Sequence, residues 1–201
     1  MTTQPPNGQN PYVITDTDTA IQMTIINAQL LFGHNYAYGS IEVHGDVVIE
    51  LTRWVNKPNH PKVNRIGLNT IKEAIQYAQK HQTKLQSLTG IALDMRINRY
   101  DALENNLPML KQKATSRSDK EQLVMAEENN CHLLTHDDNL RTLTEAILDY
   151  RALDLSDLLV ELIEAGLFDW NAFQDAVKEL NNRKERLKDY QRDKVMKALL
   201  P

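Results

Sequence analysis

The segment that decides the fold is Ser118–Leu140, with the sequence SDKEQLVMAEENNCHLLTHDDNL. Ser118 followed by Glu121 three positions later is the pattern of a capping box, so we expect a helix to begin at Ser118. Leucine, valine and alanine give this helix an apolar side, and the pair Asn129-Asn130 is a suitable place for it to end. The segment therefore opens with a capped helix that has one face for packing.

A short strand and an acidic turn follow this helix. The apolar run 131–134 is too short for another surface helix and predicts a buried strand, which ends in the polar turn 135–138. In open α/β sheets, ligands bind beyond the carboxyl ends of the strands. Asp119 at the helix start and Asp137 after the strand are therefore expected at the same edge of a sheet.

The composition is that of a soluble globular protein. Of the 201 residues, 41% are hydrophobic and 25% are charged, and the net charge is -4, which suits one domain or one domain with an appendage. A single cysteine, Cys131, excludes an internal disulfide and suits a reducing compartment. No apolar run approaches the roughly 20 residues of a membrane span, and the polar start has no signal-peptide pattern. We expect a cytoplasmic protein without membrane contact, with a disordered lead-in at residues 1–10.

A similar unit lies near the start of the chain. The run 11–15 is rich in strand formers and predicts a buried strand with Asp16 at its carboxyl end. Asp18 or Thr19 is a good N-cap for the apolar-periodic segment that follows, and Gly33 is a good stop. The pattern is again strand, acidic turn and helix.

A third unit follows at once. The apolar run 41–43 predicts a short strand, and Asp46 is placed to cap a helix over 47–55. Glu50 lies in the second turn of that helix. We therefore expect a third acidic side chain beside the same sheet.

The remaining predicted elements are mostly helical. In order, they are a loop over 56–65, a helix opened by a capping box at Thr70 and running to about Lys84, a helix after Gly90, an edge strand over 150–155, a helix capped by Ser156, and a final helix from Trp170 towards Leu199 capped by Asp169. Strand–helix units of this kind predict an α/β fold with a short parallel sheet. We place the α/β domain at 11–155 and a helical C-terminal element at 156–201.

Four acidic residues occupy comparable places in these units: Asp16, Glu50, Asp119 and Asp137. Converging carboxylates are costly, because like charges repel and each carboxylate loses hydration. A hard divalent cation removes that cost, and Mg²⁺ and Mn²⁺ prefer oxygen ligands. Such ions activate water and stabilise the leaving oxygen of a phosphodiester. The pattern therefore indicates a metal-dependent site that cleaves phosphodiesters.

Neighbouring residues compete for two of these roles. Glu42 is the alternative to Glu50 if the register of the helix differs, and Asp138 is the alternative to Asp137. Acids at helix starts also serve as caps and as partners of the helix dipole. Spacing by itself leaves these alternatives open.

Three blocks of the chain resemble the PIN-domain family, the fold of many metal-dependent ribonucleases and of toxins in bacterial toxin–antitoxin pairs. The blocks are the apolar strand ending in Asp16-Thr17-Asp18, then Glu50-Leu51 after Val47-Val48-Ile49, and then Asp119, a helix, a short apolar strand and Thr135-x-Asp137-x-x-Leu140. The third block is the most specific, because its eighteen-residue step from Asp119 to Asp137 is similar to the family's usual spacing. The resemblance covers roughly residues 11 to 150.

The resemblance implies a PIN-like three-layer α/β/α fold, rich in helix, with a helical C-terminal extension. It implies that the catalytic and metal-binding residues for Mg²⁺ or Mn²⁺ are Asp16, Glu50, Asp119 and Asp137, supported by Asp18, Thr135 and Asp138. The implied activity is that of an endoribonuclease. RNA, an antitoxin protein and a second copy of the chain are the implied partners.

The chain departs from the family pattern in three places. The stretch from Glu50 to Asp119 is longer than in minimal members, Asp18 replaces the usual Asn or Ser, and the basic tail after about residue 180 is extra. Residues 183–197 hold seven Lys or Arg against three acids. We interpret this tail either as a grip on RNA phosphates or, as its interleaved acids favour, as the solvated face of a long helix.

Two other functions stay open. The segment 13–19 also resembles the nucleophile strand of haloacid-dehalogenase-type phosphatases, in which Asp16 would attack phosphorus and Asp137-Asp138 would be the later acidic pair. Against that reading, no Gly follows Asp18, and the helix-opening Asp119 has no role in that family. The other alternative is a PIN-like module that binds without catalysis.

Overall fold

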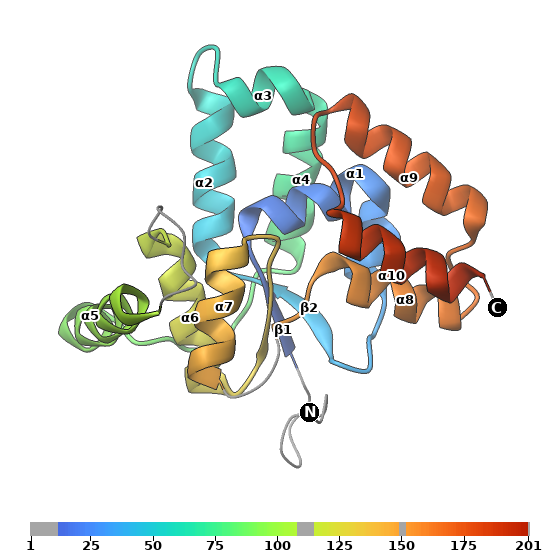
Figure 1. The fold of residues 1–201 in the computed structure, drawn as a ribbon. Coiled ribbons are helices and arrows are strands. Elements are labelled where there is room, and N and C mark those ends of the chain that lie inside the picture. The colour runs from blue at the N-terminus through green and yellow to red at the C-terminus, as the bar shows by residue number, and fades with distance from the viewer. Residues whose placement is uncertain (1–11, 108–114, 149–151, 201) are drawn as a thin grey trace.

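The computed structural model of the chain describes residues 12–107, 115–148 and 152–200 (Figure 1). It shows an α/β fold in which many helices surround a small parallel sheet, as the sequence predicts. The strands are β1 (Tyr12–Thr15), β2 (Ser40–Val43) and β3 (His132–Leu134), in the order β2-β1-β3. Both neighbours pair with β1 in parallel, and Ile14 stands opposite Glu42 on one side and Leu133 on the other. All three carboxyl ends therefore meet at one edge of the sheet.

The helices occupy most of the rest of the described chain. They are α1 (Thr17–Gly33), α2 (Gly45–Asn56), α3 (Pro61–Ile66), α4 (Leu68–Lys80), α5 (Gly90–Asn106), α6 (Arg117–Asn129), α7 (Asp138–Leu148), α8 (Leu155–Glu164), α9 (Trp170–Asn182) and α10 (Asp189–Leu199). None of these helices is both long and apolar enough to cross a membrane, in the parts of the chain that the structure describes. The predicted disordered lead-in at 1–10 lies outside the described residues.

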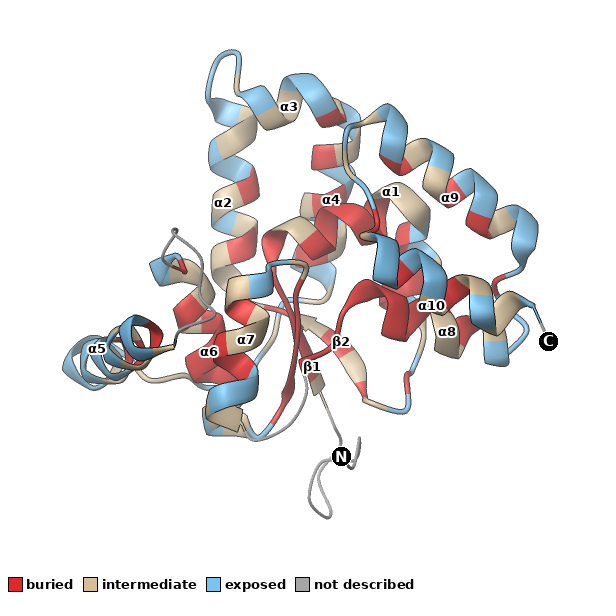
Figure 2. Cartoon of the chain, in the orientation of Figure 1, coloured by how far each residue is buried: buried red, intermediate tan, exposed pale blue. Residues whose placement is uncertain are grey.

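Hydrophobic packing covers both faces of the sheet, because side chains alternate along each strand. Val13 belongs to a large core shared with α1, α2, α4, α8 and α9. Its neighbour Ile14 belongs to a second core shared with α5, α6 and α7. Figure 2 shows the buried residues concentrated along the strands and on the inner faces of α1, α6 and α8. The strands are therefore fixed from two sides.

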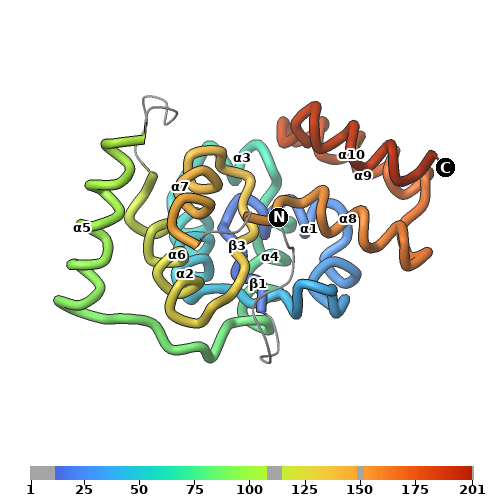
Figure 3. Tube along the Cα trace, turned by 60° about the horizontal axis from the view of Figure 1, so that its bottom comes forward, coloured from blue at the N-terminus to red at the C-terminus, as the bar shows by residue number. Residues whose placement is uncertain are grey.

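The C-terminal helices belong to the first of these cores. Leu158, Phe173, Leu180 and Val195 are buried in the same cluster as Val13. In Figure 3, α8, α9 and α10 lie together on the side of the strands opposite α5. The division of the chain at residue 155 stays a prediction, while the packing shows that α8–α10 share a core with the sheet.

The first helix begins differently from the prediction. Asp16, rather than Asp18 or Thr19, is the N-cap of α1, and its Oδ1 accepts a hydrogen bond from the backbone N of Thr19 at 2.7 Å. A residue with extended backbone at the end of a strand is already in the conformation that an N-cap requires. The predicted stop at Gly33 is confirmed.

Other helix starts also differ from the expected caps. The cap of α6 is Ser116 rather than Ser118, that of α2 is His44 rather than Asp46, and that of α8 is Asp154 rather than Ser156. The helix predicted from Thr70 begins at Leu68 after Gly67 and ends at Lys80, before the predicted Lys84. In the first three cases the capping residue lies two positions before the expected one, and at α4 Gly67 takes the capping position.

One predicted segment is wrong in kind, and two others are confirmed only in part. The loop expected over 56–65 contains helix α3, opened by a proline at its first turn. The single helix expected from Trp170 is broken into α9 and α10, and Lys184 adopts a positive φ of 55° in the break. The edge strand expected over 150–155 is reduced, in its described part, to one bridge between Leu153 and Leu134.

A buried ion pair ties α5 to the start of α6. The Lys120 side chain, 3% exposed, pairs with Glu104, which is 8% exposed, and with the half-exposed Asp101. Glu104 Oε1 also accepts hydrogen bonds from the backbone N and the hydroxyl of Thr115, each at 2.6 Å. Burial acts to raise the pKa of Glu104, but the hydrogen bonds from Lys120 and Thr115 outweigh it and lower the pKa overall. The first turn of α6 is thereby held in place.

We predict that Glu104→Gln lowers the free energy of unfolding by about 3 kcal/mol at pH 7, measured by urea denaturation, because it leaves Lys120 buried with only an exposed partner. The lowered pKa means that this stabilisation is present above the unfolded-state pKa near 4.5 and is lost as pH falls through the folded-state value. The exposed Glu73→Gln is the matched control and should cost little. Equal stability of the two variants at pH 7 would contradict the assignment.

Candidate functional site

A cleft opens beyond the carboxyl ends of the strands. Its volume is about 490 Å³. The residues that line it are Asp16, Thr17, Asp18, Glu50, Trp54, Lys62, Ser116, Asp119, His136, Asp137, Asp138 and Lys188. The structure thus brings the four predicted acids to one cleft, from the end of β1, helix α2, the first turn of α6 and the end of β3.

Asp16 is the most buried of these acids, with 4% of its surface exposed. Its Oδ1 caps α1, while its Oδ2 accepts hydrogen bonds from the hydroxyl of Thr135 and, at 3.3 Å, from the backbone N of His136. The backbone N of Asp16 donates to the carbonyl of Leu134 at 3.2 Å. One residue therefore joins the ends of β1 and β3.

Thr135 is the bridge between two of the acids. Its buried hydroxyl donates to Asp16 and accepts a hydrogen bond from the backbone N of Asp137 at 3.0 Å. Asp137 in turn uses Oδ1 to accept from the backbone N of Asn139 at 2.7 Å and of Leu140 at 3.0 Å. Among the residues that the structure describes, both of these bonds use the same oxygen of Asp137, at the start of α7.

Glu50 and Asp119 approach the cleft from its other walls. Glu50 Oε2 accepts a hydrogen bond from the hydroxyl of Thr17 at 2.6 Å, which orients it towards the start of α1. Asp119 Oδ2 accepts from the hydroxyl of Ser116 at 2.6 Å, and that hydroxyl also caps α6. The alternative ligand Glu42 does not line the cleft, since it lies on β2 beside Thr83 and Lys84.

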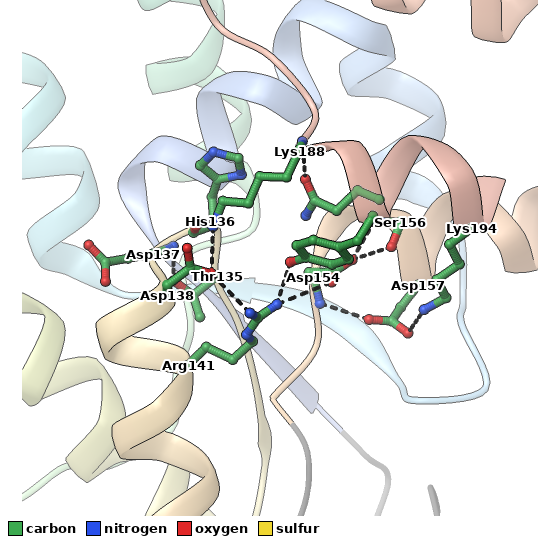
Figure 4. Close-up of polar contacts among 12 residues, drawn as sticks. Thr135, His136, Asp137, Asp138, Arg141, Asp154, Ser156, Asp157, Lys188 and Lys194 are labelled. Atoms are coloured by element: carbon green, nitrogen blue, oxygen red, sulfur yellow. Dashed lines mark hydrogen bonds and ion pairs between the residues drawn. The ribbon is translucent and has the colours of Figure 1, made fainter. Parts of the chain in front are cut away.

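The two further acids of the cleft are paired with cations. Asp18 forms an ion pair with Lys62 of α3. Asp138 pairs with Lys188 at 2.8 Å and with Arg141 at 2.9 Å (Figure 4). Burial acts to raise the pKa of Asp138, but these cations hold it below its usual value.

Sequence reasoning missed several cleft residues. Lys62 lies in the segment expected to be a loop, and Lys188 belongs to the tail interpreted as a solvated helix face. Trp54 also lines the cleft, with its ring stacked on that of His60 at 5.2 Å between centroids. The only sequence signal was the tail's excess of Lys and Arg, which does not say which residue reaches the cleft.

His136 also lines the cleft. Its Nδ1 is buried and has no hydrogen-bond partner among the described residues. Burial, followed by the charge of Lys188, lowers the pKa of His136. The ring is therefore neutral at pH 7, the form of histidine that can accept a hydrogen bond or bind a metal ion.

Three acids of the cleft have raised pKa values. Burial is the largest cause that raises the pKa of Asp16, to about 7, and the charge of Asp18 raises it further. Burial also raises the pKa of Glu50, with added repulsion from Asp18 and Asp119. Burial raises the pKa of Asp119 in the same way, and the charge of Asp137 raises it further. The pKa of each of these three carboxyls is thus raised in part by the charge of another acid of the cleft.

The carboxylate oxygens of the cleft are suitable ligands for a hard divalent cation. A bound cation would also lower the raised pKa values of these acids. Among the described residues, no group of three or more His, Cys, Asp or Glu side chains is already assembled as a metal site. The hydrogen bonds fix some oxygens of Asp16 and Asp137. Because no such group is assembled, a cation would require other acids of the cleft to move towards Asp16.

Comparison with known proteins adds no assignment: no protein-family model matches the chain, and no curated protein matches it.

We predict that in EDTA the stability of Asp16→Asn relative to wild type rises between pH 4 and pH 8. The folded carboxyl keeps its proton to about pH 7, whereas the unfolded one loses it near 3.8, so ionisation destabilises the folded wild type as pH rises. The full difference is at most about 4 kcal/mol at 1.36 kcal/mol per pH unit. Thermal and urea unfolding across this range measure it.

The exposed Asp175→Asn is the control for this experiment, and its stability relative to wild type should not change with pH. Excess Mn²⁺ should raise the melting temperature of wild type more than that of Asp16→Asn, because the cation replaces the lost stabilisation of the ionised carboxylate. A stability difference between Asp16→Asn and wild type that does not change with pH would show that the pKa of Asp16 is not raised in the folded protein.

Proposed function

We propose that this protein is a metal-dependent endoribonuclease that hydrolyses phosphodiester bonds of RNA. The observation that carries the proposal is the meeting of Asp16, Glu50, Asp119 and Asp137 in one cleft. They come from four separate segments of the chain, and packing brings them together despite their mutual repulsion. Such an arrangement is stable with a divalent cation and costly without one.

Each acid would have a distinct part in holding Mg²⁺ or Mn²⁺. Asp16, rigid and buried, would provide a fixed oxygen at the floor of the cleft, and Thr135 would hold its orientation. Glu50, Asp119 and Asp137 would close the set from three walls. The bound cation supplies a water molecule of lowered pKa and charge stabilisation for the leaving oxygen.

The finer assignment rests on the PIN-domain resemblance. A parallel sheet with helices on both faces and acids at its carboxyl edge is compatible with the three-layer PIN-like fold that the sequence blocks imply. An RNA substrate, a role as the toxin of a toxin–antitoxin pair and a homodimer are proposals of the same origin. The proposed metal-dependent chemistry does not depend on these three proposals.

The surroundings of Asp16 favour a ligand over a nucleophile. Both of its oxygens already accept hydrogen bonds, Oδ1 from Thr19 and Oδ2 from Thr135 and His136. A carboxylate held in this way has little freedom to attack a phosphorus atom, as a haloacid-dehalogenase-type phosphatase would require. It retains a lone pair for a cation.

The test is cleavage of a mixed set of single-stranded and structured RNAs, with Mn²⁺ and with EDTA. We predict that wild type cleaves only with metal, and that Asp16→Asn and Asp119→Asn each lower the rate by at least about a hundredfold, because each removes a charged ligand. Asp175→Asn, which changes the net charge equally on an exposed face of α9, should cleave like wild type.

The outcomes separate the candidate functions, provided that circular dichroism shows folded variants. Cleavage that survives both substitutions would place the activity elsewhere or in a contaminant. Absence of cleavage, together with a phosphate group trapped on Asp16, would support the phosphatase. RNA or protein binding that needs neither metal nor Asp119 would support a non-catalytic binding module.

A further inference from the structure

The C-terminal segment sends one side chain into the acidic cleft. Lys188, the residue before α10, lines the cleft opposite the helices that carry Glu50 and Asp119. Its ammonium donates to the carbonyl of His136 at 2.6 Å and pairs with Asp138 at 2.8 Å. Figure 4 shows the side chain extended from the start of α10 towards the turn that follows β3.

Buried charges hold this segment in position. Asp157 in the first turn of α8 is 4% exposed and forms an ion pair with Lys194 of α10. Asp154, the N-cap of α8, is 2% exposed and lies near Arg141, which also donates a hydrogen bond to the hydroxyl of Tyr190 (Figure 4). In each pair the acid is buried and the cation is partly exposed. Breaking a pair would leave a buried carboxylate without its cation, so these contacts hold the start of α10 near the cleft.

The contacts of Lys188 leave it able to bind a further anion. An ammonium has three donors, and two of them are used by His136 and Asp138. Asp138 is 60% exposed and has Arg141 as a second partner, so its ion pair with Lys188 contributes little to stability. Lys188 itself keeps 25% of its side chain exposed. A phosphate oxygen in the cleft can therefore reach it.

We propose that Lys188 binds a phosphate of the RNA strand beside the acidic cluster, and that the ion pairs of α8 and α10 hold it there. The inference rests on the proposed ribonuclease function and adds a substrate-binding residue to it. Acids dominate the cleft and would repel an RNA backbone, even with one cation bound. A lysine fixed at the rim supplies the positive charge that lets a phosphate approach.

The rival explanation is a structural one, in which Lys188 only stabilises the turn at His136 and Asp138. The two explanations differ in salt dependence. A lysine that contacts a phosphate displaces a counterion from single-stranded RNA, which contributes about 0.7 to the slope of log Kd against log salt concentration. A purely structural lysine contributes nothing to that slope.

The experiment measures binding of a fluorescein-labelled single-stranded RNA by anisotropy, in Ca²⁺, with the RNA checked by gel to be intact. We predict that Lys188→Met weakens binding roughly five- to tenfold and lowers the salt slope by about 0.7, as expected for one lost phosphate contact. Lys188→Arg should keep the wild-type slope, because it keeps the charge. The control is Lys197→Met, which removes the same charge from an exposed position in the last turn of α10 and should change neither quantity.

Thermal unfolding by circular dichroism confirms that the variants are folded, and Lys188→Gln replaces Lys188→Met if the latter is not. If wild type binds and cleaves RNA but neither neutral variant changes affinity or slope more than Lys197→Met, this proposal is overturned and the ribonuclease remains. If wild type neither binds nor cleaves RNA with any metal, both proposals fail together.

Discussion

The buried carboxylate of Asp16 is the contact on which the arrangement of the site depends. It caps α1 through Thr19, accepts from Thr135 and His136 after β3, and ends β1. The end of β1, the start of α1 and the distant turn after β3 are therefore fixed to one group at the carboxyl edge of the sheet. Because both oxygens are engaged, the direction of the carboxylate is set before any ligand arrives.

The ionised Asp16 carboxylate that a metal site would need is costly for the stability of the folded protein. Burial and the neighbouring charge of Asp18 raise the pKa of Asp16 to about 7, so its ionised form is disfavoured in the folded protein. The ionised forms of Glu50 and Asp119 are disfavoured as well, because burial and the charges of other acids raise their pKa values. Perturbed carboxylates gathered in one cleft are a common mark of functional sites, because evolution retains them despite their cost. The proposed cation would stabilise the ionised forms of all these carboxylates.

The C-terminal helices link this edge to the rest of the molecule. They complete the core on one face of the sheet, with Leu158, Phe173 and Val195 packed into it. They also pair buried acids of α8 with Arg141 and Lys194. The same segment that stabilises the fold therefore also brings Lys188 to the wall of the cleft.

The sequence alone was sufficient for the local and periodic features. Apolar runs bounded by polar turns predicted the strands β1, β2 and β3. Asp16 and Asp137 at the carboxyl ends of β1 and β3, Glu50 on the helix after β2, and Asp119 at the start of the helix before β3 were predicted as neighbours and line one cleft. These predictions succeed because parallel strands share one carboxyl edge, so position along each unit determines position in space. Helix caps were predicted less well, since several side chains near each start are able to cap. At α1, the extended backbone at the end of β1 places Asp16 in the capping position.

Tertiary structure decided which side chains reach the cleft from elsewhere. Lys62 comes from a helix in a segment whose composition indicated a loop, and Lys188 comes from a tail whose mixed charges indicated a solvated face. The break at Lys184 turns α10 back onto α8, and only that turn brings Lys188 beside His136. These contacts join residues that are 44 positions apart for Lys62 and Asp18 and 52 apart for Lys188 and His136. A pattern of neighbouring residues does not report contacts between segments so far apart in the chain. The sequence therefore predicted which acids line the cleft, whereas only the fold decided which lysines do.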